Sequence, residues 1–263
     1  MKKKKLDSNF KNRVFVVVAL LLIMFLSLYT VFKGDFSLNS FYKVESRVAK
    51  LKEKHKEDSS VIGWVKVQGT DIDYPVIYNN GKSLDSVSYN YAWVNDEEFS
   101  NNVVIFGHNI RNVSSKPLIA DKGHERFEQL PSLLYYDFAK ANQFIQYTVD
   151  GKDYLYQIFS VAIVEDKYID YKGEKLSNGT FEKVVAGAKY DSYFDYDVKV
   201  KKDDKILSLV TCTRFYGGLG YDIRVVAKLV GEESLGVSKK VIEKDSYKEI
   251  KKKMLAVDKN HEA

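Results

Sequence analysis

The segment that most constrains this chain is Ile206–Leu229, which reads ILSLVTCTRFYGGLGYDIRVVAKL. Two β-rich runs flank a turn with three glycines, a pattern typical of two strands joined by a loop. Cys212, the one cysteine of the chain, lies at the end of the first run. Reactive side chains often lie where a strand passes into a loop, but a lone cysteine is also commonly a small buried hydrophobe.

A second strand end carries a histidine. Val103–Phe106 is a continuous apolar run, which predicts a buried strand, and Gly-His-Asn follows it. His108 in that position can take the proton of a thiol, or stabilise the thiolate as an imidazolium, and later protonate a leaving amine. The alternative is a histidine that only caps a loop.

The candidate cationic group lies on the second β-rich run. An arginine cannot act as a base, but its fixed charge can hold a substrate or a developing oxyanion. Arg224 follows Cys212 by twelve residues, so a hairpin would return it beside the cysteine. Arg214 is the competitor, since it is only two residues from Cys212, although from the loop side it could instead point to solvent. Asp222 is available to orient a neighbouring group, although nothing in the sequence requires it.

The chain begins with a basic tail and a long apolar run. Val14–Phe32 contains 19 residues without a charge, which as a helix span roughly 28 Å, close to the thickness of a bilayer core. The lysines before it predict a cytoplasmic tail over residues 1–13 by the positive-inside rule. A cleaved signal peptide is the alternative, but no A-x-A-like site follows the run. We therefore expect an uncleaved signal-anchor over 14–32, with the remainder outside the cytoplasm.

The charge balance argues against nucleic-acid binding. The formal net charge is +5, and the first 13 residues account for all of it with six basic side chains and one acidic one. The rest of the chain is therefore neutral and offers no basic field to a phosphate backbone. One cysteine excludes an internal disulfide, and the four histidines show no zinc-ligand spacing.

The pattern of the remaining chain predicts a mostly β domain with flanking helices. Residues 33–60 are interpreted as a linker and a helix over 37–57, residues 61–230 as a β-rich domain, and residues 231–263 as a polar tail with a helix over 237–256. Strands are predicted over 61–67, 72–77, 143–149 and 154–164, and a helix over 181–190. Residues 79–101 are predicted to form a long loop that contains Tyr89, Tyr91 and Trp93.

These motifs, in this order, resemble the sortase family, and most of all its class B. SLVTCT and the later DIRVVAKL resemble the family's strand-borne Thr-Cys and downstream arginine, and VIFGHN resembles its histidine motif. GWVKVQGTDIDYPVI resembles its opening strand pair, and residues 181–212 resemble the helix that class B inserts before the cysteine strand. The likeness runs from about Ser37 to Leu229.

The resemblance implies a fold and a set of roles. The fold would be a closed sortase-type β-barrel with flanking helices, preceded by one transmembrane helix. Cys212 would be the nucleophile, His108 the acid/base partner and Arg224 the clamp for substrate or oxyanion. Thr211 would help to bind the substrate, with Asn109 as a secondary candidate, and no metal or cofactor is expected.

The resemblance also implies an activity. Family members cleave a C-terminal sorting motif of a secreted protein, hold the acyl part as a thioester, and transfer it to an amine. The acceptor would be the peptidoglycan precursor lipid II or, in a pilin-polymerising enzyme, a pilin lysine. The enzyme would sit at the cell membrane with its catalytic domain outside. A cysteine hydrolase of cell-wall peptides, and a non-catalytic domain that binds through the loop with Tyr89, Tyr91 and Trp93, are the alternatives.

One departure from class B concerns acidic residues. Many class B members carry an acidic residue close after the cysteine, where this chain has Thr213 and Arg214. A carboxylate in the mechanism is therefore not expected at that position, and Asp222 is only a weak substitute. Residues 109–136 and the tail after Leu229 also fit the class poorly.

Overall fold

The computed structural model describes residues 17–18, 42–79, 92–96, 98–109, 113, 127–166, 174–218, 220–231 and 236–259. The chain separates into two compact units, Met1–Asn39 and Ser40–Ala263. Of the predicted membrane segment 14–32, only Val17 and Val18 are described, and both are helical and exposed. Within the described ranges, no helix has the length and apolar character needed to cross a membrane.

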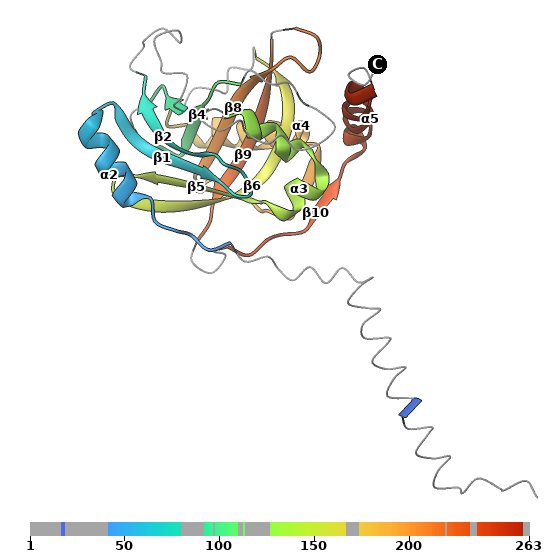
Figure 1. The fold of residues 1–263 in the computed structure, drawn as a ribbon, viewed down its shortest axis with the longest axis horizontal. Helices are drawn as coiled ribbons and strands as arrows, with labels where there is room; N and C mark the ends of the chain where they lie inside the picture. The colour runs from blue at the N-terminus through green and yellow to red at the C-terminus, as the bar shows by residue number, and fades with distance from the viewer. Residues whose placement is uncertain are drawn as a thin grey trace, which may run out of the picture. The chain divides into compact units, whose positions relative to one another are not determined.

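The second unit is built on a closed β-barrel (Figure 1). Its described strands follow the order β1-β2-β3-β4-β8-β9-β6-β5 around the barrel. Their bounds are β1 Val61–Val67, β2 Asp73–Tyr78, β3 Ala92–Val94, β4 Asn102–Phe106, β5 Phe144–Val149, β6 Lys152–Glu165, β8 Ile206–Thr213 and β9 Tyr221–Leu229. The predicted fold, a closed barrel with flanking helices, is confirmed.

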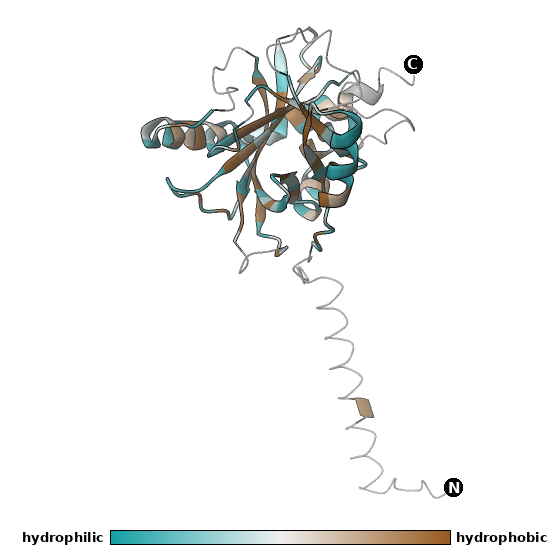
Figure 2. Cartoon of the chain, turned by 90° about the vertical axis from the view of Figure 1, so that its left-hand side faces the viewer, coloured by the Kyte–Doolittle hydropathy of each residue, from teal (hydrophilic) through white to brown (hydrophobic). Residues whose placement is uncertain are grey.

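Alternation of side chains decides which residues fill the barrel. In β1, buried residues alternate with partly exposed ones, and Val65 and Val67 join the main hydrophobic core. Successive strand residues point to opposite faces, so one face fills the interior while the other remains available for helices or for a site. Figure 2 shows hydrophobic residues concentrated in the barrel strands, while the outer helices carry hydrophilic residues beside hydrophobic ones.

The described helices pack around this barrel. Their bounds are α2 Val48–Glu57, the 3-10 helix η2 Phe127–Leu134, α3 Tyr136–Ala141, α4 Asn178–Asp191 and α5 Asp245–Lys259. α4 contains the predicted helix 181–190 and buries Phe181, Val184, Val185 and Ala188. Ser177 caps its first turn, because its side chain accepts a hydrogen bond from the Thr180 amide.

The helix predicted over 37–57 is wrong at its start. α2 begins at Val48, and residues 42–47 are not helical, while 37–41 lie outside the described residues. The Tyr42 amide donates to the Gly236 carbonyl at 2.9 Å, and the Arg47 amide donates to Asp153 Oδ1 at 3.0 Å. These tertiary hydrogen bonds hold the non-helical segment against the rest of the domain, which the helical periodicity of its apolar residues does not reveal.

Two connections were predicted from the sequence, a hairpin turn at Asp150 and Gly151 and a long loop over 79–101, and only the hairpin agrees with the structure. The hairpin of β5 and β6 is confirmed, and Asp150 and Gly151 at its turn both have positive φ, as a tight hairpin turn requires. The long loop predicted over 79–101 instead contains the short strand β3. Trp93 is therefore a buried strand residue, 5% exposed, and not part of a binding loop, while Tyr89 and Tyr91 lie outside the described residues.

The segment after Leu229 differs from the predicted polar tail. Val241–Glu243 forms strand β10, which pairs with β7, Phe194–Tyr196, and the helix starts at Asp245, not at Val237. Val241, Tyr247, Ile250 and Met254 of this segment are buried in the main core. The excess of charged residues reflects the exposed face of an amphipathic helix, whose other face completes the domain.

Besides Asp153, which accepts from the Arg47 amide, Asp73 fixes the non-helical segment before α2 to the barrel. Asp73 accepts three hydrogen bonds from the guanidinium of Arg47, two at 2.9 Å and one at 3.2 Å, and one from Trp64 Nε1 at 2.6 Å. Partial burial acts to raise the pKa of Asp73, but these hydrogen bonds and the charge of Arg47 outweigh it, so its pKa lies below the usual carboxyl range.

This network predicts acid sensitivity of the fold. A carboxyl whose pKa is lower in the folded protein stabilises it fully above the unfolded pKa, and that contribution is lost as the pH falls through the folded pKa. We expect Asp73→Asn to lower the free energy of unfolding by roughly 2–3 kcal/mol at pH 7, and to reduce its dependence on pH below about 4. Urea unfolding at pH 7 and at pH 3 measures both effects. Asp195→Asn, whose side chain is 69% exposed and pairs with Lys244 only at 3.7 Å, is the control and should change neither; equal effects of the two variants would contradict the prediction.

Candidate active site

Cys212 lies on the outer face of the barrel, one residue before the end of β8. Its neighbours Thr211 and Thr213 are each 2% exposed, whereas Cys212 itself is exposed. Strand alternation therefore turns both threonines inward and the thiol outward. The interpretation of Cys212 as a small buried hydrophobe is wrong.

His108 follows strand β4 and lies beside Cys212 of β8 in the strand register. β4 runs parallel to β8 with Phe106 paired to Val210, so His108 and Cys212 each lie two residues beyond a matched pair. The Gly107 amide continues the ladder by donating to the Val210 carbonyl at 3.1 Å. Residues two apart share a face, so the imidazole and the thiol both project from the outer side of the barrel.

The loop that carries His108 is fastened to the cysteine strand by three further hydrogen bonds. Thr211 Oγ1 donates to the Gly107 carbonyl at 2.6 Å, and Asn109 Nδ2 donates to the Cys212 carbonyl at 3.1 Å. Cys212 Sγ lies 3.4 Å from the Asn109 carbonyl oxygen, to which it donates. The two residues predicted to bind substrate, Thr211 and Asn109, therefore join the strand ends that bear the cysteine and the histidine.

The histidine ring is held by packing that the sequence does not indicate. It lies against the indole of Trp93 at 4.8 Å between ring centroids, and Trp93 also stacks on Phe106 at 5.8 Å. The His108 carbonyl accepts a hydrogen bond from the Phe127 amide at 2.9 Å. His108 is half-buried at this position.

Gly107 is required by close packing beside the histidine. A Cβ atom at this position would lie 2.4 Å from the ring of Phe127, which is completely buried. Such a contact would push the ring, or the strand end with His108, out of place. The glycine of the Gly-His-Asn motif thus allows η2 to approach the end of β4.

Arg224 shares the outer face with Cys212 but is not its direct cross-strand partner. β8 and β9 are antiparallel, with Cys212 opposite Asp222 and Val210 opposite Arg224. Arg224 is therefore a diagonal neighbour of the cysteine, at the spacing that long side chains span. The expectation that the hairpin brings the arginine back to this face is met, while the position opposite the cysteine belongs to Asp222.

The two candidate arginines differ sharply in their surroundings. Arg214 is exposed on the loop after β8, whereas Arg224 is only 3% exposed. Arg224 Nη2 donates to Asp191 Oδ2 at 2.8 Å, and Asp191 is the last residue of α4. Arg224 Nε is buried and has no hydrogen-bond partner within the described ranges, so this donor is left for another acceptor.

The loop after Cys212 rests on the C-terminal helix. Lys253 of α5 lies over the rings of Phe215 and Tyr216, with Nζ at 4.9 and 4.2 Å from their centroids. Burial raises the pKa of Tyr216 and of Tyr193. Both phenols therefore stay neutral near pH 7. α5 thus supports the loop next to the candidate nucleophile, a contact that the sequence does not indicate.

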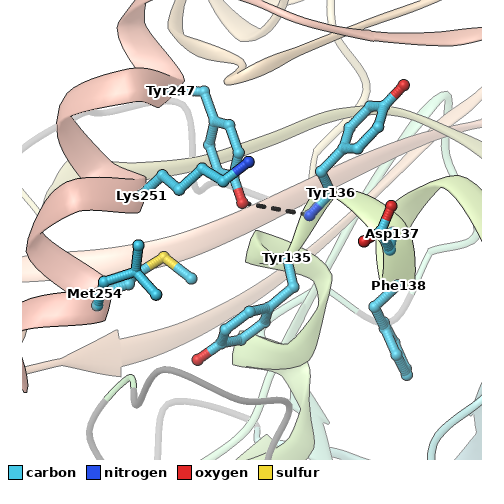
Figure 3. Close-up of a pocket in the computed structure, with 8 residues that line it drawn as sticks. Tyr135, Tyr136, Asp137, Phe138, Tyr247, Lys251 and Met254 are labelled. Carbon is cyan, nitrogen blue, oxygen red and sulfur yellow. Dashed lines mark hydrogen bonds between the residues drawn. The ribbon is translucent and has the colours of Figure 1, made fainter. Parts of the chain in front are cut away.

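A separate pocket lies between α3 and α5 (Figure 3). Its volume is about 290 Å³, and its walls include Tyr135, Phe138, Lys251 and Met254. The Tyr136 amide donates to the Tyr247 hydroxyl at 3.2 Å at its edge. Its lining includes neither Cys212 nor the residues that flank it, so the candidate active site is an outer strand surface and not this pocket.

A closed barrel that carries a thiol, an imidazole and a guanidinium on one outer face defines a class of cysteine enzymes that act on acyl groups. Residues 65–230, more than half of the chain, match the Sortase domain family. The chain belongs to the sortase family, whose members are cysteine transpeptidases.

Individual relatives place the chain with class B. It is 26% identical to sortase B of Listeria monocytogenes over 175 residues, which is 62% of this chain and 66% of that relative, just under two thirds of it. It is 22% identical to sortase B of Staphylococcus aureus over 240 residues, 83% of this chain and 95% of that one. The X-ray structure of Clostridium perfringens sortase B is similar with a TM-score of 0.56 and 25% identity, covering 68% of this chain and 99% of the other.

Proposed function

We propose that this chain is a membrane-anchored transpeptidase that cleaves a C-terminal sorting motif of secreted proteins and transfers the acyl part to an amine. One observation carries the proposal: Cys212, His108 and Arg224 project from the same outer face of three adjacent strands, β4, β8 and β9. Cys212 is the nucleophile, His108 the acid and base, and Arg224 the clamp on the substrate carbonyl.

The reaction uses these groups in two steps. The Cys212 thiolate attacks the scissile carbonyl, a bond from Sγ to carbon forms, and the bond from carbon to the leaving amine breaks as protonated His108 gives that amine its proton. The incoming amine then attacks the thioester, His108 takes the proton of that amine, and the thiolate is released. Neither step needs a metal or a redox cofactor to balance.

Arg224 is suited to hold the negative charge that develops on the carbonyl oxygen. Its guanidinium is always charged, and its buried Nε has no acceptor within the described residues. A hydrogen bond to the oxyanion from a group shielded from water is far stronger than one in bulk solvent. Thr211 and Asn109 contribute to the substrate site by fixing the two strand ends on which it is built.

The proposal includes the layout of the chain. Residues 1–13 are cytoplasmic, 14–32 form the membrane anchor, 33–60 the linker and helix, 61–230 the catalytic barrel, and 231–263 the C-terminal segment. The support is the charge-free run after a basic tail. The enzyme would then face the outer side of the cell membrane, where secreted substrates emerge.

Lipid II is the proposed amine acceptor, which makes cell-wall anchoring the proposed outcome. A pilin lysine is the alternative acceptor, and water would make the enzyme a hydrolase of cell-wall peptides. Competition separates these outcomes, because an added amine diverts the product from acid to amide only in an enzyme that transfers.

The test of the proposal is intact-mass spectrometry of the protein mixed with a pool of sorting-motif peptides, with and without hydroxylamine. We expect an acyl mass gain on Cys212 that hydroxylamine releases as a hydroxamate, which also identifies the preferred motif. If no adduct forms although iodoacetamide still alkylates Cys212, the transpeptidase assignment is wrong.

The choice of arginine gives a second prediction. Arg224→Lys keeps the charge but loses the planar donor fork, so we expect kcat/KM to fall about 100-fold or more. Arg214→Ala removes an exposed cation and should leave kcat/KM within about threefold. Initial rates on the motif identified by mass spectrometry measure both, and the reverse order of effects would assign the clamp to Arg214.

A further inference from the structure

We propose that Asp191 is a positioning residue for Arg224, and that α4 contributes to the reaction through it. This inference rests on the proposed function of Arg224. Asp191 Oδ2 accepts a 2.8 Å hydrogen bond from Arg224 Nη2, and the side chains are 25% and 4% exposed respectively. It is the one carboxylate that forms an ion pair with this guanidinium within the described ranges of the chain.

The residues directly opposite Arg224 on the two neighbouring strands carry no charge. Its cross-strand partners are Val210 on β8 and Ala162 on β6, both apolar and buried. A guanidinium that is almost fully buried requires a counter-charge or hydrogen bonds to offset its desolvation. Asp191 reaches it from α4, which lies outside the sheet, so the pair bridges two elements that are distant in the sequence.

The position of Asp191 on its helix supports a role for this pair. An aspartate at the last residue of a helix faces the negative end of the helix dipole, which is unfavourable unless a cation is near. The guanidinium of Arg224 supplies that cation and also interacts favourably with the same helix end. Asp191 and Arg224 therefore stabilise each other. Alone, the arginine would be a buried unpaired charge, and the aspartate would face the negative end of the helix dipole.

The end of α4 is also rigidly attached to the barrel beside Arg224. Ser160 Oγ donates to the Ala188 carbonyl at 2.6 Å, and the Val161 amide donates to Ser192 Oγ at 3.1 Å. The Tyr193 amide donates back to the Val161 carbonyl at 2.9 Å. These bonds to β6 lie on both sides of Asp191 in the sequence, so its carboxylate is fixed relative to the sheet.

The hydrogen bond to Asp191 sets the orientation of the Arg224 guanidinium. Asp191 engages Nη2, while Nε stays buried without a partner within the described residues. Because the guanidinium is planar, a bond at Nη2 fixes the direction of the Nε hydrogen. Asp191 would thus aim the remaining donors at the substrate carbonyl, and its loss should affect the transition state more than substrate binding.

The experiment compares Asp191→Asn with Asp195→Asn in the detergent-solubilised full-length protein. Asp195 is a matched control, because its side chain is 69% exposed and pairs with Lys244 only at 3.7 Å. We expect Asp191→Asn to lower kcat about 10- to 100-fold with KM nearly unchanged, and Asp195→Asn to retain wild-type values. Wild-type kcat in folded Asp191→Asn would overturn the proposal, as would a loss that appears only in KM.

A double-mutant cycle separates positioning from a general loss of stability. If Asp191 acts through Arg224, adding Asp191→Asn to Arg224→Lys should lower kcat little further, whereas independent effects would multiply and overturn the proposal. Asp191→Glu keeps the carboxylate and should recover part of the activity; if it is no better than Asp191→Asn at equal melting temperature, the proposal is also wrong. An inactive wild-type protein would instead refute the proposed function itself.

Discussion

Cys212→Ala is expected to lower turnover of a sorting-motif peptide by about 10⁴-fold or more, because no other group nearby can form the thioester. The hydroxylamine-sensitive adduct should disappear from the intact mass spectrum. Cys212 is exposed, and its sulfur makes one 3.4 Å contact with the Asn109 carbonyl. The variant should therefore keep the free energy of unfolding within about 0.5 kcal/mol of wild type.

Activity assays paired with thermal unfolding test this expectation. Ser208→Ala is a suitable control, because Ser208 lies on the same strand and face four residues before Cys212. It should remain active. Substantial turnover by folded Cys212→Ala would remove the thiol from the mechanism.

His108→Ala should lower kcat/KM by about 10³-fold, which is the range for loss of a positioned acid and base. Both steps would slow, since the first needs a proton for the leaving amine and the second needs a base for the incoming one. Single-turnover measurements of thioester formation and of its aminolysis would resolve the two. We expect both rate constants to fall.

His55→Ala is the matched control for the histidine. His55 lies on α2 and its Nδ1 is 2.7 Å from the Val61 carbonyl oxygen, so it also makes a backbone contact. Its removal should leave kcat/KM unchanged. A loss below tenfold in His108→Ala, or an equal loss in both variants, would contradict the acid/base assignment.

The departure from class B near the cysteine has a structural counterpart. Thr213 is buried and its Oγ1 accepts a hydrogen bond from the Phe215 amide at 3.2 Å, so it shapes the turn after the strand. Arg214 is exposed beyond it. The residue opposite Cys212 on the next strand is Asp222. A sequence that lacks an acid directly after the cysteine therefore still presents one across the hairpin.

The local pattern of the sequence was sufficient to predict the elements that bear the site. Alternating and continuous apolar runs mark β4, β8 and β9, because side-chain period and turn residues are encoded within a few positions. The ends of those runs indicated Cys212 and His108, and hairpin geometry indicated that Arg224 returns to the same face. These patterns predicted a mostly β domain with flanking helices, whereas the closed barrel and the family followed from the resemblance of the ordered motifs to sortases.

The tertiary structure alone decided which groups meet around those residues. The parallel pairing of β4 with β8 joins strands about a hundred residues apart, and no local period specifies such a partner. The same holds for Trp93 against His108, Lys253 over the loop after Cys212, and Asp191 at Arg224. The sequence thus determined which side chains can do chemistry, while long-range packing determined how they are held, because burial and ion pairing depend on contacts between distant segments.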